Sequence, residues 1–512
     1  MNVIVVLFDT MRIDHLSCYG AEQASNGLNE KIRTPHLDRF AKQSVRFTNG
    51  LIGSFPCMPA RRELWTGRYE FPWRGWGPLE DNDFDFIDFL RSSGCITQLI
   101  SDHYHLLERD AGNYHFGFSG WDMIRGQEHD PYITEPLADG TKAGIDHRTS
   151  GAWYLHQKNK RGGRRDEESL YAPRVFRKAC SWLERNADRK TRRDKPFFLM
   201  VESFDPHEPW DPPLHRIERF DPGFEGKRPH SPVYGASSRF TDDELRHIRA
   251  LYAAELTMVD TWFGRLLDQI DALDLWDDTM IVATTDHGFF LGEHGLVGKP
   301  DLIPLYNEMS RIPFMMYHPD AKRGTESNEL VQLVDVFPTI VDALGLDLTF
   351  GRSDEFVAGK EARKTWEGVQ SKPPHGISLM PALLGREPSK SREIAVTGKF
   401  GDILRVSDGK WSLYVVPDGD APLYWHGRRE PGRTFAGRRG AFDQVKERYP
   451  IQYPVIRKEN ELYHIASDPG ETDNLIVKER STAHRLRKQL AKWFTAIDAP
   501  KETLVRYGVS EL

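Results

Sequence analysis

The sequence predicts an α/β fold in which a central sheet of buried strands lies between layers of helices. Two patterns indicate this fold. Short apolar runs rich in β-branched residues have the length and composition of buried strands. Between these runs lie amphipathic patterns in which apolar residues recur every three to four positions, as on one face of a helix. Alternation of the two kinds of segment is typical of layered α/β proteins.

The expected strands cover Asn2–Phe8, Cys95–Ile100, Phe197–Val201 and Met280–Thr284. The expected helices cover Pro35–Ser44, Ala172–Asn186 and Asp242–Ile270. Each strand is followed within two residues by Asp or Glu, with His nearby in three of the four cases, and these residues can bind a metal ion or transfer a proton. Ligands of open α/β sheets bind beside the carboxyl ends of the strands. We therefore expect the four strand ends to meet in one crevice.

The sequence changes character after about residue 375. Short, separated strand patterns cover Glu393–Thr397, Asp402–Val406, Lys410–Val416 and Glu461–Ile465, and an amphipathic helix covers Ser481–Ile497. We predict a larger α/β domain over residues 1–375 and a smaller C-terminal α+β subdomain over residues 376–512. The subdomain is expected to contain a small antiparallel sheet and the terminal helix. The charged, proline-containing segment Asp354–Pro374 is the expected connection.

The composition narrows the class of protein and its location. The chain has 512 residues, a net charge of −7 and a pI near 6.3, so we expect neither nucleic acid nor a membrane as a partner. Its four cysteines lie far apart, which predicts no disulfide framework and favours a reducing compartment. The opening stretch MNVIVVLFDTMR has no basic region typical of a signal peptide and is too short to span a membrane. A cytoplasmic location is the expectation.

Cys57 begins the stretch CMPAR, which ends at Arg61 and is followed by LWTGR. These residues resemble the sulfatase signature C-x-P-S/A-R with its trailing L-x-T-G. Further blocks resemble the same family in the same order: Asp9–Arg12, Thr34–Asp38, Pro206–Pro209, Asp286–Lys299 and Glu461–Leu475. The chain is identified as a member of the type I sulfatases, which belong to the alkaline phosphatase superfamily. The resemblance implies an alkaline-phosphatase-like fold with a central mixed sheet between helices.

The resemblance also implies a chemical role for Cys57. In sulfatases of this type a maturation enzyme oxidises the motif cysteine to formylglycine, an aldehyde that hydrates to a geminal diol. One diol oxygen attacks the sulfur of the ester, and the other later expels the sulfate by re-forming the aldehyde. Pro59 and Arg61 would be read by the maturation enzyme, and Arg61 would also hold the diol. A lone cysteine is commonly a small buried hydrophobic residue, but the register of the whole motif favours the catalytic role.

One divalent metal ion is expected beside this residue, because a bound cation lowers the pKa of an oxygen nucleophile. By resemblance the ligands are Asp9, Asp286, His287 and the modified Cys57. Calcium is the family's usual ion, and an imidazole ligand also suits manganese. The sequence departs from the commonest pattern at Thr10, where many sulfatases carry a second aspartate. We do not count Thr10 as a ligand.

Positive groups and a proton source are expected around the sulfate. Lys299, His207 and His105 match the lysine and histidines of the family's motifs. Lys299 would bind the sulfuryl oxygens, His207 would protonate the leaving oxygen, and His105 would help to open the diol. His103 replaces the family's usual lysine. As an exposed imidazole with a pKa near 6.5 it would bind substrate as a titratable cation.

Three functions remain open on the sequence alone. The first is hydrolysis of a small-molecule or saccharide sulfate ester, and the second is hydrolysis of a phosphonate monoester or phosphodiester with the same machinery. The pair Asp286-His287 and the missing second aspartate favour the second, whereas the signature and His105 favour the first. The third is a non-catalytic protein that binds sulfated ligands, which would be expected to lack Cys57, a metal aspartate or Lys299. Homo-oligomer formation also stays open.

Overall fold

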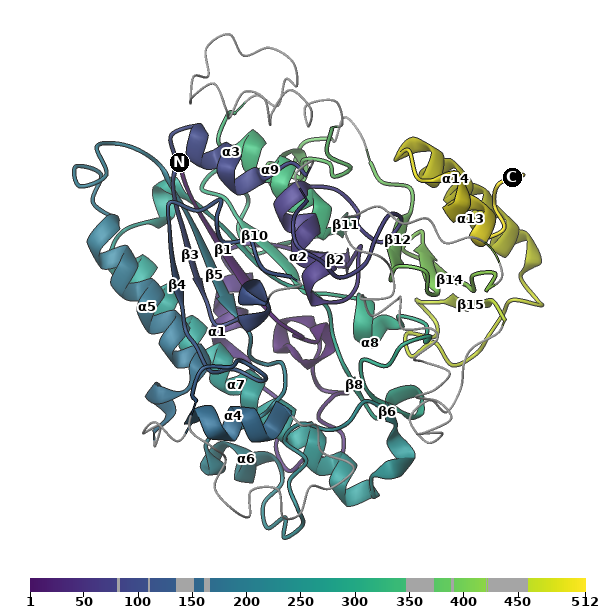
Figure 1. Cartoon of the computed structure of the whole chain (residues 1–512), viewed down its shortest axis with the longest axis horizontal. Helices are drawn as coiled ribbons and strands as arrows, with labels where there is room; N and C mark the ends of the chain where they lie inside the picture. Colours follow the sequence, from purple (N-terminus) through teal and green to yellow (C-terminus); the bar gives the residue numbers. More distant parts are fainter. Residues whose placement is uncertain are drawn as a thin grey trace.

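The computed structural model describes residues 1–80, 83–108, 111–134, 152–160, 166–346, 373–387, 391–419, 421 and 459–512. A central eight-stranded sheet runs through the molecule in the order β11-β2-β10-β7-β1-β5-β3-β4 (Figure 1). Its strands are β1 (Asn2–Phe8), β2 (Val45–Leu51), β3 (Ile96–Ser101), β4 (Gly120–Met123), β5 (Phe197–Ser203), β7 (Thr279–Thr285), β10 (Phe314–Tyr317) and β11 (Thr325–Gln332).

The sheet is mixed. β1 pairs in parallel with β5 and β7, and β3 pairs in parallel with β5, whereas β10 runs antiparallel to both β2 and β7. All four predicted strands are present, and none of their ends differs by more than two residues from the one expected. The predicted α/β fold with a central mixed sheet is confirmed.

Helices cover both faces of the sheet because alternate residues of its strands point to opposite sides. Val3, Val5 and Leu7 of β1 belong to one hydrophobic cluster, which includes side chains of α2 (Cys57–Thr66), α3 (Phe86–Ser92) and α9 (Val336–Ala343). Ile4, Val6 and Phe8 belong to a second cluster with α1 (Pro35–Ala41), α5 (Tyr171–Asn186) and α7 (Asp242–Ala272). The strand is therefore buried on both faces, as its continuous apolar sequence indicates.

A smaller antiparallel sheet follows in the C-terminal part of the chain (Figure 1). It consists of β12 (Ala395–Gly398), β13 (Leu404–Ser407), β14 (Trp411–Val415) and β15 (Glu461–His464), and α13 (Arg480–Ala496) shares its hydrophobic cluster. The predicted smaller subdomain is thus present. The boundary between residues 375 and 376 stays a prediction, and most of its expected connection, Asp354–Pro374, lies outside the described residues.

The small sheet touches the stretch that precedes Cys57. The backbone N–H of Phe55 donates to the carbonyl oxygen of Gly398 over 2.9 Å, and the N–H of Gly398 donates to Gly53 over 2.8 Å. These bonds join the end of β12 to the turn that leads into α2. The C-terminal part of the chain therefore helps to fix the backbone beside Cys57.

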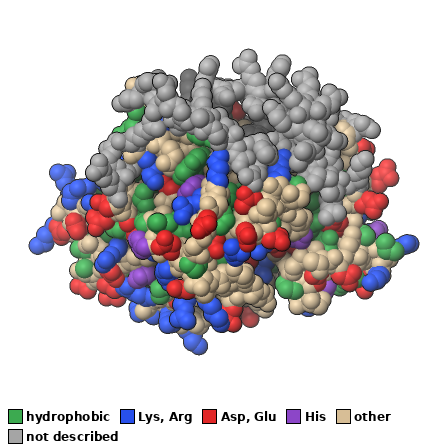
Figure 2. Space-filling model, turned by 90° about the horizontal axis from the view of Figure 1, so that it is seen from below, with side chains coloured by type: hydrophobic (Ala, Val, Ile, Leu, Met, Phe, Trp, Pro, Cys, Tyr) green, Lys and Arg blue, Asp and Glu red, His purple; other side chains and the backbone are tan. Residues whose placement is uncertain are grey.

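Other features agree with the composition of the chain. All four cysteines are free, as their spacing predicts. On the face shown in Figure 2, the coloured Lys and Arg side chains lie interspersed with Asp and Glu side chains. Within the described residues, no helix combines the length and the apolar character needed to cross a membrane.

Phe263 is a test of the packing that holds the helices on the sheet. Its ring is fully buried on α7 and meets Phe8 at 5.7 Å, Phe40 at 5.7 Å and Phe176 at 6.3 Å between centroids. Phe263→Ala leaves a cavity, so we expect a loss of about 3–5 kcal/mol in the free energy of unfolding, measured by urea denaturation. The exposed neighbour Arg265 is the control, since Arg265→Ala should change it by less than about 0.5 kcal/mol. Equal effects of the two substitutions would contradict this packing.

Candidate active site

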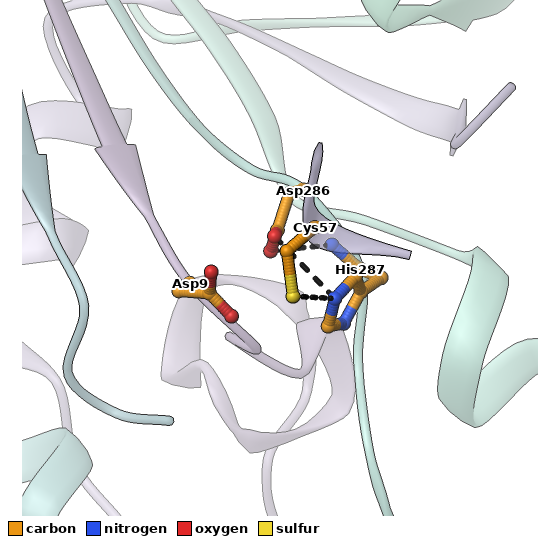
Figure 3. Close-up of side chains that lie close together, drawn as sticks. All are labelled: Asp9, Cys57, Asp286 and His287. Carbon is orange, nitrogen blue, oxygen red and sulfur yellow. Dashed lines mark hydrogen bonds and ion pairs between the residues drawn. The ribbon is translucent and has the colours of Figure 1, made fainter. Parts of the chain in front are cut away.

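Four side chains meet at the carboxyl edge of the central sheet (Figure 3): Asp9, Cys57, Asp286 and His287. All four are buried, and one possible ligand atom from each lies within 4.8 Å of the others. Asp9 follows β1, Asp286 and His287 follow β7, and Cys57 is the first residue of α2. The group offers carboxylate, imidazole and sulfur donors around one point. Its two carboxylates suit a divalent cation that prefers oxygen ligands.

Arg61 lies behind this group, one helical turn after Cys57, and it is fully buried. Its guanidinium donates from Nη2 to Asp9 over 2.9 Å and from Nη1 to Asp286 over 2.6 Å. A third bond runs from Nε to Glu202 at the end of β5 over 2.5 Å, and Nη1 also donates to the carbonyl oxygen of Cys57 over 3.0 Å. One cation thus ties together the ends of β1, β5 and β7 and the start of α2.

Thr10 orients both aspartates. Its hydroxyl group donates to Asp9 Oδ1 over 2.6 Å, and its backbone N–H donates to Asp286 Oδ1 over 3.0 Å. Its φ of 62° lies in the left-handed region, which is strained for a β-branched residue. Thr10, at the position where many sulfatases carry a second aspartate, thus orients the carboxylate of Asp9.

Lys299 and His207 form a close pair, with 2.5 Å between Nζ and Nε2. His207 Nδ1 lies 2.5 Å from the carbonyl oxygen of Glu208, so Nδ1 carries a proton and donates it there. The other ring nitrogen then accepts from the Lys299 ammonium. Burial and the neighbouring Lys299 lower the pKa of His207 to about 4, rather than leaving it near neutrality as the sequence suggests. His207 is therefore a neutral imidazole in this arrangement.

His103 differs from its expected state. Its side chain is fully buried rather than exposed, and its Nε2 lies 3.3 Å from Asp9 Oδ2. Burial and the charge of Arg61 lower its pKa well below the usual value, despite the contact with Asp9. The expectation of an exposed imidazole that titrates near pH 6.5 is wrong, because the end of β3 is covered by Phe204, whose ring centroid lies 5.1 Å from that of His103.

His105 lies between two carboxylates. Its Nδ1 is 2.7 Å from Glu108 Oε2, and its Nε2 is 3.6 Å from Glu128 Oε2. Burial opposes its charge, but the two carboxylates outweigh burial and raise the pKa of His105 to about 9. The imidazole also makes an edge-to-face contact with the Trp76 ring, with 4.9 Å between centroids. His105 is thus a cation at neutral pH, unlike His103 and His207.

The structure adds residues that the motifs did not single out. Glu202 shares Arg61 with the two aspartates and also accepts from the Ser101 hydroxyl group over 2.8 Å. Glu202 is an acidic residue near the end of an otherwise apolar, buried strand, and this pattern could have identified it from the sequence. Glu128 lies in a loop with no motif and gave no such signal.

Arg61→Lys tests the junction of the three strands. A lysine ammonium cannot bridge three carboxylates in a fixed fork, so buried charge is left uncompensated. We expect a loss of about 3–5 kcal/mol in unfolding free energy and a fall in kcat of about 10²-fold. Arg62→Lys is the matched control on the same helix, because Arg62 pairs with Glu70 and Asp83 instead. It should lower stability and leave kcat within a few-fold, and an equal loss of kcat would contradict a special role for Arg61.

Comparison with known proteins agrees with this geometry. The sequence model of the family described as Sulfatase matches residues 1–346. The multifunctional alkaline phosphatase superfamily protein PehA from Trinickia caryophylli is 26% identical over 470 residues, covering 81% of this chain and 85% of that protein. Choline-sulfatase from Rhizobium meliloti is 24% identical over 451 residues, covering 81% of this chain and 78% of that protein.

A solved structure shows the same fold. The phosphonate monoester hydrolase of Agrobacterium radiobacter aligns with a TM-score of 0.65 at 20% identity, covering 97% of this chain and 95% of that one. At this identity the likeness concerns the fold, which is the alkaline-phosphatase-like arrangement. The family match extends over about two thirds of the chain and includes Cys57, Arg61 and the four metal-site candidates. The chain therefore belongs to the sulfatase family of enzymes.

Proposed function

We propose that this enzyme hydrolyses a sulfate ester with formylglycine made from Cys57 as its nucleophile. The observation that carries the proposal is the position of Cys57, whose Sγ lies within 4.8 Å of donor atoms of Asp9, Asp286 and His287. Burial and the charge of Asp9 raise the pKa of the Cys57 thiol well above its usual value. An unmodified cysteine here is a neutral thiol and a weak nucleophile. A hydrated aldehyde at this position would supply an oxygen nucleophile instead.

The donor set fits one divalent cation. Asp9, Asp286, His287 and the modified residue 57 would hold it, and the ion would lower the pKa of an oxygen bound to it. Burial opposes the charge of Asp9, but the charge of Arg61 outweighs burial and lowers its pKa well below the usual value, so Asp9 is ionised and ready to bind. Two carboxylates and an imidazole are compatible with calcium and with manganese. We propose calcium as the usual ion of the family.

The remaining residues bind the anion and hold the proton. Lys299 keeps its charge, since burial is outweighed by nearby acidic groups, among them Glu208 and Asp9, which raise its pKa. It would bind the sulfuryl oxygens and, through its contact with Nε2 of His207, belong to the pair that protonates the leaving oxygen. His105 would present a second cation to the substrate. Arg61 would act through the aspartates that it orients. His103 lies against Asp9 and would contribute shape near the substrate rather than positive charge.

Hydrolysis of a phosphonate monoester or phosphodiester is the second candidate. It is favoured by Thr10, which replaces a second aspartate, and by the Asp286-His287 pair. The similar proteins point the same way, since one is called multifunctional and another is a phosphonate monoester hydrolase. Sulfate monoesters, phosphonate monoesters and phosphodiesters all carry one negative charge, so the same cations suit each of them. The non-catalytic alternative is disfavoured because the candidate nucleophile, the metal group and Lys299 are all present.

The proposal also names partners. A formylglycine-generating maturation enzyme would convert Cys57 before or during folding, because the residue is 3% exposed in the folded chain. The substrate would be a small-molecule or saccharide sulfate ester, and the choline-sulfatase relative is an example of the first kind. Cytoplasmic location stays a prediction of the sequence.

A substrate panel tests the function. On enzyme co-produced with a maturation enzyme, we expect kcat/KM to be at least about 10-fold higher for an aryl sulfate than for an aryl phosphonate monoester or a phosphodiester. The reverse order would assign the second candidate function. Activity toward none of the three would contradict both hydrolase proposals.

The same preparations test the nucleophile. An aminooxy reagent reacts with an aldehyde and not with a thiol, so peptide mass spectrometry should find the label at residue 57 of unfolded, active enzyme. Cys57→Ala should lose both label and activity. Full activity with an unlabelled, unmodified Cys57 would exclude the formylglycine mechanism.

Asp286→Asn tests the metal group. It keeps the size of the side chain and removes one negative charge, so we expect the bound divalent ion to fall from about one equivalent to a small fraction, with loss of turnover. Elemental analysis of the purified proteins measures this. Asp260→Asn is the matched control, because Asp260 is also buried but accepts the backbone N–H groups of His36 and Leu37. It should retain the ion, and an active Asp286→Asn enzyme after exhaustive chelation would contradict the site.

A further inference from the structure

Glu128 has a backbone conformation that carries strain. It lies in the loop between β4 and α4 (Ala152–Lys160), and its φ of 43° falls in the left-handed region. A residue with a long side chain adopts that region only where its surroundings impose it. The surrounding structure therefore fixes the position of the Glu128 side chain.

The loop that carries Glu128 is fixed by buried polar side chains. The backbone N–H of Glu128 donates to Nδ1 of His156 on α4 over 3.2 Å. Asn159, on the same helix, donates to the carbonyl oxygens of Gly126 and Asp130 over 3.0 and 2.9 Å. Further bonds run to Gly126 from the Tyr171 hydroxyl group and from Gln127 to Asp205 and Asp102. Four elements of the α/β domain therefore hold this loop against the strand ends.

The carboxylate that this loop positions faces His105. Its Oε2 is 3.6 Å from His105 Nε2, and its Oε1 is 3.2 Å from Nδ1 of His129. The Glu128 side chain is only 13% exposed, so solvent screens its charge weakly. Its Oε2 is buried and has no hydrogen-bond partner within the described residues apart from this ion pair.

Several other side chains surround His105. Glu108 approaches its Nδ1 from the same turn, and the rings of His103, Tyr104, Phe204 and Trp76 lie around it. Burial opposes a charge on His105, whereas Glu108 and Glu128 favour it. Burial opposes the charge of Glu128, but His105 and His129 outweigh burial and lower its pKa well below the usual value. Both members of the pair are therefore charged at neutral pH.

We propose that Glu128 is a positioning residue of the active site, which holds the His105 ring from the Nε2 side while Glu108 contacts Nδ1. Glu108 lies nearer but is 35% exposed, whereas Glu128 is 13% exposed and less screened by solvent. The pairing itself is a property of this structure, and only its effect on turnover rests on the proposed function.

The protonation of His105 can be measured without turnover. In a Cys57→Ala background, histidine-selective NMR should give a His105 titration midpoint in the alkaline range. Glu128→Gln keeps the shape and removes the charge, so the midpoint should fall by at least about one pH unit. Glu22→Gln removes the charge of an exposed glutamate paired with Lys31 and should leave the midpoint unchanged. An unchanged His105 midpoint in Glu128→Gln would overturn the proposal.

Two further readouts separate this role from a structural one. Glu128→Gly relieves the positive φ that Glu128→Gln retains, so Glu128→Gly should have the higher Tm of the two while the His105 midpoint falls in both. In the active enzyme, Glu128→Gln should shift the alkaline limb of kcat/KM to lower pH, because His105 loses its proton earlier. Superimposable pH profiles in an active enzyme would also overturn the proposal. An enzyme inactive on every ester would instead contradict the proposed function, and the NMR result would still decide the role of Glu128.

Discussion

Three carboxylates buried around the single guanidinium of Arg61 set the geometry of the site. Asp9, Glu202 and Asp286 lie at the ends of three adjacent strands, and all three carboxylates are buried away from bulk water. Buried carboxylates are tolerated only when a cation pairs with them. Because Arg61 lies one turn after Cys57 on α2, the same interaction that offsets part of the negative charge of the strand ends also places Cys57 beside them. One guanidinium leaves an excess of negative charge among the three carboxylates, which suits a divalent cation.

The sequence predicts this part of the site well, for physical reasons. Continuous apolar runs mark strands buried on both faces, and parallel strands bring their carboxyl ends to one edge. The convergence of Asp9 and Asp286 follows from that rule alone. The signature around Cys57 identifies Arg61 as a site residue, although neither the helix α2 nor the partners of its guanidinium could be read from it. Glu202 also lies at the end of a predicted strand, but it was not singled out, because a single acidic residue at a strand end has many structural uses.

The protonation states of the three histidines could not be predicted, because they depend on contacts between segments far apart in the sequence. His103, His105 and His207 belong to two short motifs, yet one is buried against Asp9, one lies between two glutamates and one accepts from Lys299. An imidazole near its unperturbed pKa responds to each of these surroundings in a different direction. Glu128, one of the two carboxylates beside His105, comes from a loop with no periodic pattern.

The pair formed by Lys299 and His207 limits how a proton can reach the leaving oxygen. Two cations 2.5 Å apart repel strongly in a buried place, so the pair holds one proton between Nζ and Nε2, and that proton belongs to the lysine. His207 cannot store a second proton on Nε2 before an anion binds. If the proposed hydrolysis takes place, negative charge that develops on the leaving oxygen would be met by the lysine proton, while the neutral imidazole stays hydrogen-bonded to the carbonyl oxygen of Glu208 and fixes the direction of the pair. The role expected for His207 alone is then shared, with the charge on Lys299 and the orientation supplied by His207.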